Sequence, residues 1–175
     1  MRQALAHFKT ITKHRRLVRR GCFRVGLYYQ GLTHDLSKYT PVEFFAGCRY
    51  FSGTESPNNA QRRDLGLSPA WLHHKGRNRH HFEYWIDYSL SPDRHLTGMK
   101  MPVKYVVEMF MDRVAASRVY QKDAYTDRSA LEYYQRSPVK ELIHPESAAL
   151  LESMLYKLAA EGEKAVYDYI RTYVL

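Results

Sequence analysis

The segment "MPVKYVVEMFMDRVAASRVY", residues 101–120, decides the fold class. Pro102 has the fixed φ that suits the first turn of a helix, and no glycine or further proline interrupts the segment before Tyr120. One face at helical spacing is apolar except for a single acid, and its members are Tyr105, Met109, Asp112, Ala116 and Val119. We therefore predict a core helix over about 102–120 that carries a carboxylate on its buried face.

Helix signals also dominate the rest of the chain. We predict helices over residues 3–29, from the capping box "TPVE" at 40–43, from Ser68–Pro69 to about Asp87, from Asp127 or Ser129 to before Pro138, and from Pro145 to the end with a break at Gly162. Residues 52–59 and 90–98 are expected to be loops, and no alternating strand pattern is present. The expected fold class is all-α.

Length and composition limit the protein to one core. With 175 residues, of which 45% are hydrophobic, we expect a single domain over residues 1–175. No run approaches the roughly 20 apolar residues of a membrane span. The basic N-terminus does not fit a secretory signal, so we expect a soluble, cytoplasmic protein with no membrane partner. Cys22 and Cys48 lie far apart and are expected to be free core residues.

The charge of the chain favours an anionic partner. Net charge is +9 with a pI near 9.5, and "KHRRLVRR" at 13–20 concentrates the positive charge near the start. Nucleic acid and a phosphorylated small molecule are the two candidates. The plain alternative is a solvated helix face, because the four arginines of this segment recur at i, i+1, i+4 and i+5.

A histidine-rich segment, "WLHHKGRNRHHFEYW" at 71–85, suggests a metal site. If residues 69–87 are helical, one stripe consists of His74, Asn78, His81 and Trp85, and a parallel stripe about 100° round contains His73 and His80. A single histidine more often has a surface or capping role. Four within nine positions make metal binding the better interpretation.

Two further positions could complete such a site. In "HDLSK", the adjacent His34 and Asp35 allow a carboxylate to bridge two cations, and Lys38 could orient it or meet a substrate oxygen. Asp35 could instead cap a helix. Asp112 needs a positive partner if it is buried, and an ion pair with Arg113 or Arg118 is the alternative to a metal.

The order of these residues resembles the HD-domain superfamily of metal-dependent phosphohydrolases. The ordered series is His14, His34–Asp35, His74, His80–His81 and Asp112. More closely, "GLTHDLSKYTPVEF", "AWLHHKGRNRHHFEYW", "MPVKYVVEMFMDRVAASR" and "HPES" resemble a catalogued domain-of-unknown-function family of bacterial and phage proteins, over most of residues 10–150. The resemblance implies an HD-like bundle of about six to eight helices.

The resemblance also implies a set of metal ligands. A first metal would be held by His14, His34, Asp35 and Asp112, with Asp35 bridging to a second metal held by His74 with His80 or His81. Two consecutive helical residues diverge by about 100°, so both cannot point at the same ion. The stripe favours His81 and leaves His80 on the second metal or on substrate.

The expected reaction is phosphoester hydrolysis. Two cations would turn water into hydroxide as the nucleophile and stabilise an in-line displacement, with Asp35 and Lys38 as catalytic residues. We expect one or two ions of Fe, Mn, Co, Ni or Zn. The expected substrate is a phosphorylated small molecule such as a nucleotide, with phosphate-binding candidates Lys38, Arg77, Arg113 and Arg118. The alternatives are a metal-stabilised structural or interaction protein and a basic nucleic-acid-binding module.

Overall fold

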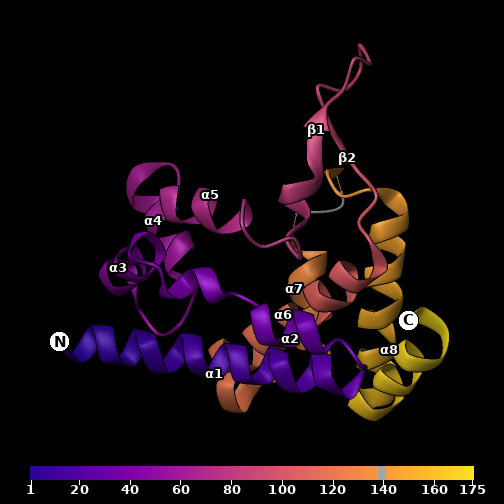
Figure 1. Cartoon of the computed structure of the whole chain (residues 1–175), viewed down its shortest axis with the longest axis horizontal. Coiled ribbons are helices and arrows are strands. Elements are labelled where there is room, and N and C mark those ends of the chain that lie inside the picture. Colours follow the sequence, from indigo (N-terminus) through magenta and orange to yellow (C-terminus); the bar gives the residue numbers. More distant parts are fainter. Residues whose placement is uncertain (138–140) are drawn as a thin grey trace.

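The structure is a computed structural model that describes residues 1–137 and 141–175. The described residues contain the helices α1 (Arg2–Arg24), α2 (Tyr28–Thr33), α3 (Pro41–Tyr50), α4 (Pro57–Leu65), α5 (Pro69–Lys75), α6 (Val103–Gln121), α7 (Ser129–Gln135) and α8 (Pro145–Tyr169). Short 3-10 segments are η1 (Leu36–Tyr39), η2 (Phe82–Trp85) and η3 (Lys122–Ala124), and a π-helical turn, η5 (Ile170–Val174), ends the chain. The all-α prediction is confirmed (Figure 1).

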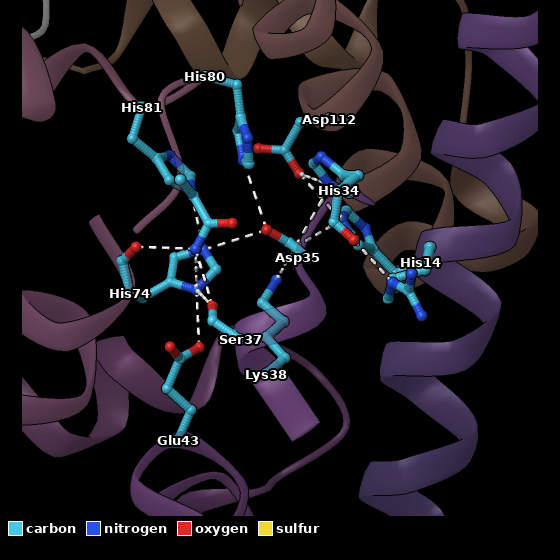
Figure 2. A network of polar contacts seen from close by, with 12 residues as sticks. His14, His34, Asp35, Ser37, Lys38, Glu43, His74, His80, His81 and Asp112 are labelled. Carbon is cyan, nitrogen blue, oxygen red and sulfur yellow. Dashed lines mark hydrogen bonds and ion pairs between the residues drawn. The ribbon is translucent and has the colours of Figure 1, made fainter. Parts of the chain in front are cut away.

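The core is organised around α6. Its buried residues point in all directions around the helix axis, and α6 packs against α1, α2, α7 and α8. A helix with buried residues on several sides needs neighbours around it, and these four helices pack against α6 from different directions (Figure 1). Figure 1 shows α1 running along one edge of the molecule, with its C-terminal end near α8. The candidate metal-binding side chains lie between α1 and the segment that contains His74, His80 and His81 (Figure 2).

The predicted helix over 69–87 is wrong after its second turn. It begins at Pro69 as expected, with the Ser68 hydroxyl accepting from Trp71 N at 3.1 Å, but α5 ends at Lys75. The side-chain amide of Asn78 donates to the His74 carbonyl at 2.8 Å. In a continuing helix the backbone N–H of residue 78 would donate to this same carbonyl. The side-chain amide occupies the acceptor instead, and the helix does not continue.

The first predicted helix, over residues 3–29, is interrupted: α1 ends at Arg24 and α2 begins at Tyr28.

Small elements differ from the predictions as well. A two-stranded antiparallel hairpin, β1 (Ile86–Tyr88) and β2 (Leu96–Gly98), pairs Ile86 with Gly98, so part of the loop predicted over 90–98 is a strand. Helix α4 begins at Pro57, inside the loop predicted over 52–59. The predicted starts of α3, α6, α7 and α8 are correct, and Gly162 breaks the helical φ/ψ of α8 with φ of 84°. Pro138 lies outside the described residues.

The capping box predicted at "TPVE" does not form. Thr40 makes no side-chain cap, and its hydroxyl instead donates to Ser37 O at 2.6 Å. Glu43 is buried and turns towards the histidines of α5. Helix α3 still begins at Pro41, because proline suits a first helical position. Glu43, which was expected to cap α3, therefore contacts His73 and His74 instead.

The structure also bears on the predictions about the two cysteines and about membrane-spanning segments. In the described part of the chain Cys22 and Cys48 form no disulfide, as expected, and Cys22 is a core residue, but Cys48 is only half-buried. Among the described residues, no helix has both the length and the apolar character needed to span a bilayer.

His7 lies buried where α1 crosses α3. Its ring centroid is 5.5 Å from that of Phe44 and 5.6 Å from that of Phe51. A Cβ atom at Gly47 would lie 2.2 Å from His7 Nε2, so only glycine lets α3 approach this closely. Burial, aided by the positive charge of Lys38, lowers the pKa of His7 from 6.5 to about 4. The imidazole is therefore neutral in the folded protein at neutral pH.

We expect His7 to make the protein acid-sensitive. Because the folded-state pKa is the lower one, its contribution is complete above about pH 6.5, falls as the pH drops towards about 4, and does not change further below that. Over this window the wild type should lose about 3 kcal/mol more of its unfolding free energy than His7→Gln, which cannot be protonated. Urea unfolding of both proteins at several pH values measures the difference. Parallel stability curves would contradict the assignment.

Candidate metal centre

Seven ionisable side chains from four parts of the chain meet beside α6. The chain turns sharply after α2, and Asp35 adopts a left-handed conformation there with φ of 54°. Aspartate tolerates this conformation better than most residues, and the turn sends both His34 and Asp35 inward. Figure 2 shows the Asp35 carboxylate at the centre of the group, with histidines on both sides of it. The Asp35 side chain is fully buried.

The first group surrounds one oxygen of Asp35. Asp35 Oδ2 lies 3.4 Å from His14 Nε2 and 3.3 Å from His34 Nε2. Asp112 Oδ1, from α6, lies 2.9 Å from His14 Nε2 and 3.5 Å from His34 Nε2. These four residues present two imidazole nitrogens and two carboxylate oxygens to one small volume.

The second group surrounds the other oxygen of Asp35. Asp35 Oδ1 lies 3.2 Å from His74 Nε2 and 3.4 Å from His80 Nε2, while His74 Nε2 and His81 Nε2 are 2.9 Å apart. Within the part of the chain that the structure describes, Asp35 Oδ1 and His80 Nε2 are buried and have no hydrogen-bond partner. A buried polar atom left unpaired is costly, so these two atoms are explained best if a cation lies between them.

Two glutamates hold the histidines from behind. Glu108 Oε1 accepts from His34 Nδ1 at 2.8 Å and from His80 Nδ1 at 3.1 Å. The two oxygens of Glu43 accept from His74 Nδ1 and His73 Nδ1, each at 2.7 Å. A carboxylate only accepts, so Nδ1 of each of these rings carries a proton, and the Nε2 atoms of His34, His74 and His80 face Asp35. This arrangement is typical of metal-binding histidines.

Lys38 completes the inner network. Its ammonium donates to Asp35 Oδ2 at 2.6 Å. Burial would raise the pKa of the Asp35 carboxyl, but His34, Lys38 and His74 hold that pKa well below its usual value. Burial would likewise lower the pKa of His34, yet the carboxylates of Asp35, Asp112 and Glu108 raise it above its usual value. Asp35 is therefore ionised, and its negative charge is stabilised by the positive groups around it.

The structure brings together every residue predicted as a metal ligand, namely His14, His34, Asp35, His74, His80, His81 and Asp112. Their role as ligands stays a prediction. Asp112 contacts His14 and His34, and among the described residues it forms no ion pair with Arg113 or Arg118. His73 lies outside both groups and contacts Glu43.

The premise that His80 and His81 lie on one helix is wrong. Both residues follow the end of α5, and both belong to the group around Asp35 Oδ1 that could hold a metal, so helical divergence does not exclude a shared ion. The stripe of His74, Asn78, His81 and Trp85 does not exist as a helix face either. Asn78 instead donates to Ser37 Oγ at 2.8 Å and holds the turn beside His74.

The three arginines predicted to bind phosphate have their contacts elsewhere. Arg77 is exposed and donates to the His73 carbonyl at 3.2 Å. The guanidinium of Arg113 lies over the ring of Tyr134, with its Cζ atom 5.5 Å from the ring centroid. Arg118 pairs with Glu163 of α8 at 3.2 Å. Of the predicted phosphate-binding residues, Lys38 is the one that contacts a candidate ligand in the described residues.

Sequence reasoning missed Glu43 and Glu108. Glu108 lies four residues before Asp112, so both acids share a face of the helix predicted over 102–120, and this spacing was the available signal. Glu43 was visible, but its position three residues after Thr40 favoured a capping role. Nothing in the local sequence around Glu43 indicates that it contacts His73 and His74.

Fold and site together define an all-helical protein with a buried cluster of histidines and carboxylates that could hold a metal ion. A family model matches residues 3–157, and the chain belongs to that family, a family of unknown function (DUF5662). No curated protein and no solved structure matches the chain significantly.

Proposed function

We propose that the protein is a metal-dependent phosphohydrolase with two divalent cations, acting on a phosphate ester such as a nucleotide. The observation that carries the proposal is the position of Asp35. Its two carboxylate oxygens face two separate groups of imidazole nitrogens, which is the arrangement expected of a ligand that bridges two ions. The ordered motifs that resemble HD-domain phosphohydrolases support the same reaction.

The residues fit two cations. Among the described residues, Asp35 Oδ1 and His80 Nε2 lack hydrogen-bond partners, and the Nδ1 atoms of three histidines donate to carboxylates. Mixed nitrogen and oxygen ligands favour Fe, Mn, Co, Ni or Zn over magnesium. Such ions would supply Lewis acidity to phosphate oxygens and a lowered pKa to bound water.

The remaining residues define how a phosphate could enter. The side chain of Asp112 is 17% exposed and that of Lys38 is 27% exposed, whereas those of Asp35 and His34 are fully buried. In the proposed reaction the phosphate therefore approaches the cluster beside Asp112 and Lys38, which are partly exposed. In the proposed reaction Lys38 binds a phosphate oxygen, and its contact with Asp35 fixes the position of the ammonium.

Activity assays with defined metals test the proposal. The protein is stripped with a chelator, reloaded separately with each of the five metals, and assayed with nucleoside monophosphates and with mono- and diester phosphates. We expect hydrolysis only in reloaded samples. Lys38→Met should keep its metal content but lose about 100-fold in kcat, because a positive charge next to the developing negative charge is lost.

Lys104→Met is the matched control, since Lys104 is exposed on α6 and should leave metal content and kcat unchanged. A fully loaded wild type that hydrolyses none of these substrates would contradict the proposal. The near-complete burial of His34, Asp35, His74 and His80 would then favour the second candidate function, a metal-stabilised structural protein. In that case removal of the metal should unfold the protein.

A further inference from the structure

The positive charge of the protein is concentrated in one helix. Helix α1 contains eight of the 27 lysines and arginines and none of the 18 acidic residues. The rest of the chain therefore carries 19 basic and 18 acidic residues and is close to neutral. Almost all of the net positive charge of the protein therefore comes from α1.

The basic residues of α1 form a row opposite the row that faces the core. Residues His7, Ile11, His14 and Val18 are buried. Two positions further on from each of them lie the exposed Lys9, Lys13, Arg16 and Arg20, here called the basic row. Two residues correspond to a rotation of about 200°, so the basic row points away from His14 and the metal centre.

The basic row has no acidic partners in the described part of the chain. No carboxylate lies within ion-pair distance of its four members, whereas Arg24 at the end of the same helix pairs with Glu163 at 3.3 Å. Arg15 is also used internally, donating to the His34 carbonyl at 2.7 Å. Like charges at this spacing repel one another, so an anion bound along the row would relieve an unfavourable arrangement.

The surface along the basic row is hollowed. A groove of about 350 Å³ is lined by the basic row together with Phe8, Thr12 and Leu17. At Leu17 and Arg20 it adjoins a cavity of about 70 Å³ between α1, α6 and α8. Arg24 and Arg118 lie in the wall of that cavity. Both arginines pair with Glu163, which lies in the same wall, so the cations open to an extended ligand are those of the basic row.

We propose that the basic row binds the phosphodiester backbone of nucleic acid, independently of base sequence. The row extends over eleven residue steps, or about 16 Å. One strand of a duplex presents about five phosphates over that length. An anionic membrane is the less suitable partner, because the apolar face of α1, with Ile11, Val18 and Cys22, is buried in the core and cannot enter a bilayer.

The proposed surface is separate from the metal centre. Because the basic row and His14 lie on opposite faces of α1, substitutions in the row should leave metal content unchanged. Binding of nucleic acid should also persist when the protein has no hydrolase activity. Failure of one proposal therefore does not imply failure of the other.

Fluorescence anisotropy with two labelled DNA duplexes of unrelated sequence, each about 20 base pairs, tests the proposal. We expect similar affinity for both, with a slope of about −3 to −4 in log K against log salt. The triple variant Lys9→Gln, Arg16→Gln, Arg20→Gln should bind about 100-fold more weakly with a slope smaller by about three. The matched control is Arg94→Gln, Lys104→Gln, Arg136→Gln, which removes three exposed charges outside α1 and should bind like the wild type.

Three results would overturn the proposal. They are no DNA binding by the wild type at low salt, equal losses in the two triple variants, or binding to phosphatidylserine vesicles without binding to DNA. Circular dichroism and metal content establish that the first triple variant is folded. Weak binding by a folded, fully metal-loaded triple variant, together with normal binding by the control, supports the assignment.

Discussion

Replacement of Asp35 by asparagine should remove both metal ions at once. Asp35 is the one residue shared by the two four-membered groups in the described structure, and each of its oxygens faces a different group. An amide is nearly isosteric with the carboxylate but carries no charge, so both groups lose their central anion. We expect metal content to fall from about two ions per chain to below about 0.2, with any hydrolase activity lost as well.

The same substitution should also weaken the metal-free fold. The Lys38 ammonium donates to Asp35 Oδ2 at 2.6 Å. The Nε2 atoms of His34 and His74 lie within 3.3 Å of the Asp35 carboxylate oxygens. Breaking a buried ionic network by removing one partner costs about 3–5 kcal/mol. Elemental analysis and urea unfolding measure the two effects.

Asp93→Asn is the control for Asp35→Asn, because Asp93 is exposed in the hairpin loop. It should change neither metal content nor stability. If Asp35→Asn retained one full equivalent of metal, the bridging role of Asp35 would be wrong, and each group would have to hold its ion without it.

The sequence predicted most helix starts but not where the histidine helix ends. Pro41, Pro69 and Pro145 each begin a helix, because proline at a first helical position is a local signal. The end of α5 depends on the Asn78 side chain binding the His74 carbonyl, and a helical periodicity argument does not detect such a bond.

Candidate ligands were easier to predict than their geometry. Histidine and aspartate are uncommon enough on buried faces that their order along the chain identified the cluster, whereas their directions depended on a helix that is absent beyond Lys75. The supporting glutamates were missed for a different reason. Glu43 meets its partners 30 and 31 residues away, so a tertiary contact decides its role and no local pattern does.

Glu108 couples the two halves of the centre. Its Oε1 accepts from His34 Nδ1 in the first group and from His80 Nδ1 in the second. Glu108, His34 and His80 are also close enough to hold an ion by themselves. However, the Nδ1–Oε1 distances of 2.8 and 3.1 Å are those of hydrogen bonds, and the Nε2 atoms of both rings face Asp35. We therefore expect Glu108 to orient the two rings and make them more basic.

Glu43 gives the matched comparison for Glu108. Both are buried glutamates that accept from two Nδ1 atoms, but of the two partners of Glu43 only His74 belongs to a metal group. Loss of such a supporting carboxylate typically costs 10–100-fold in metal affinity. Glu108→Gln should therefore weaken both binding steps by about 10–100-fold, whereas Glu43→Gln should weaken one step by that factor and leave the other unchanged.

Calorimetric titration of the stripped proteins with one metal separates the two steps. If Glu108→Gln affected a single step, the two halves would not be coupled through this carboxylate. If the wild type bound a third equivalent of metal and Glu108→Gln lost it, Glu108 would be a direct ligand and not a supporting residue. The two substitutions remove the same charge from buried positions near the same cluster. If Glu108→Gln weakens both binding steps and Glu43→Gln weakens only one, the Glu108 carboxylate must therefore serve both groups.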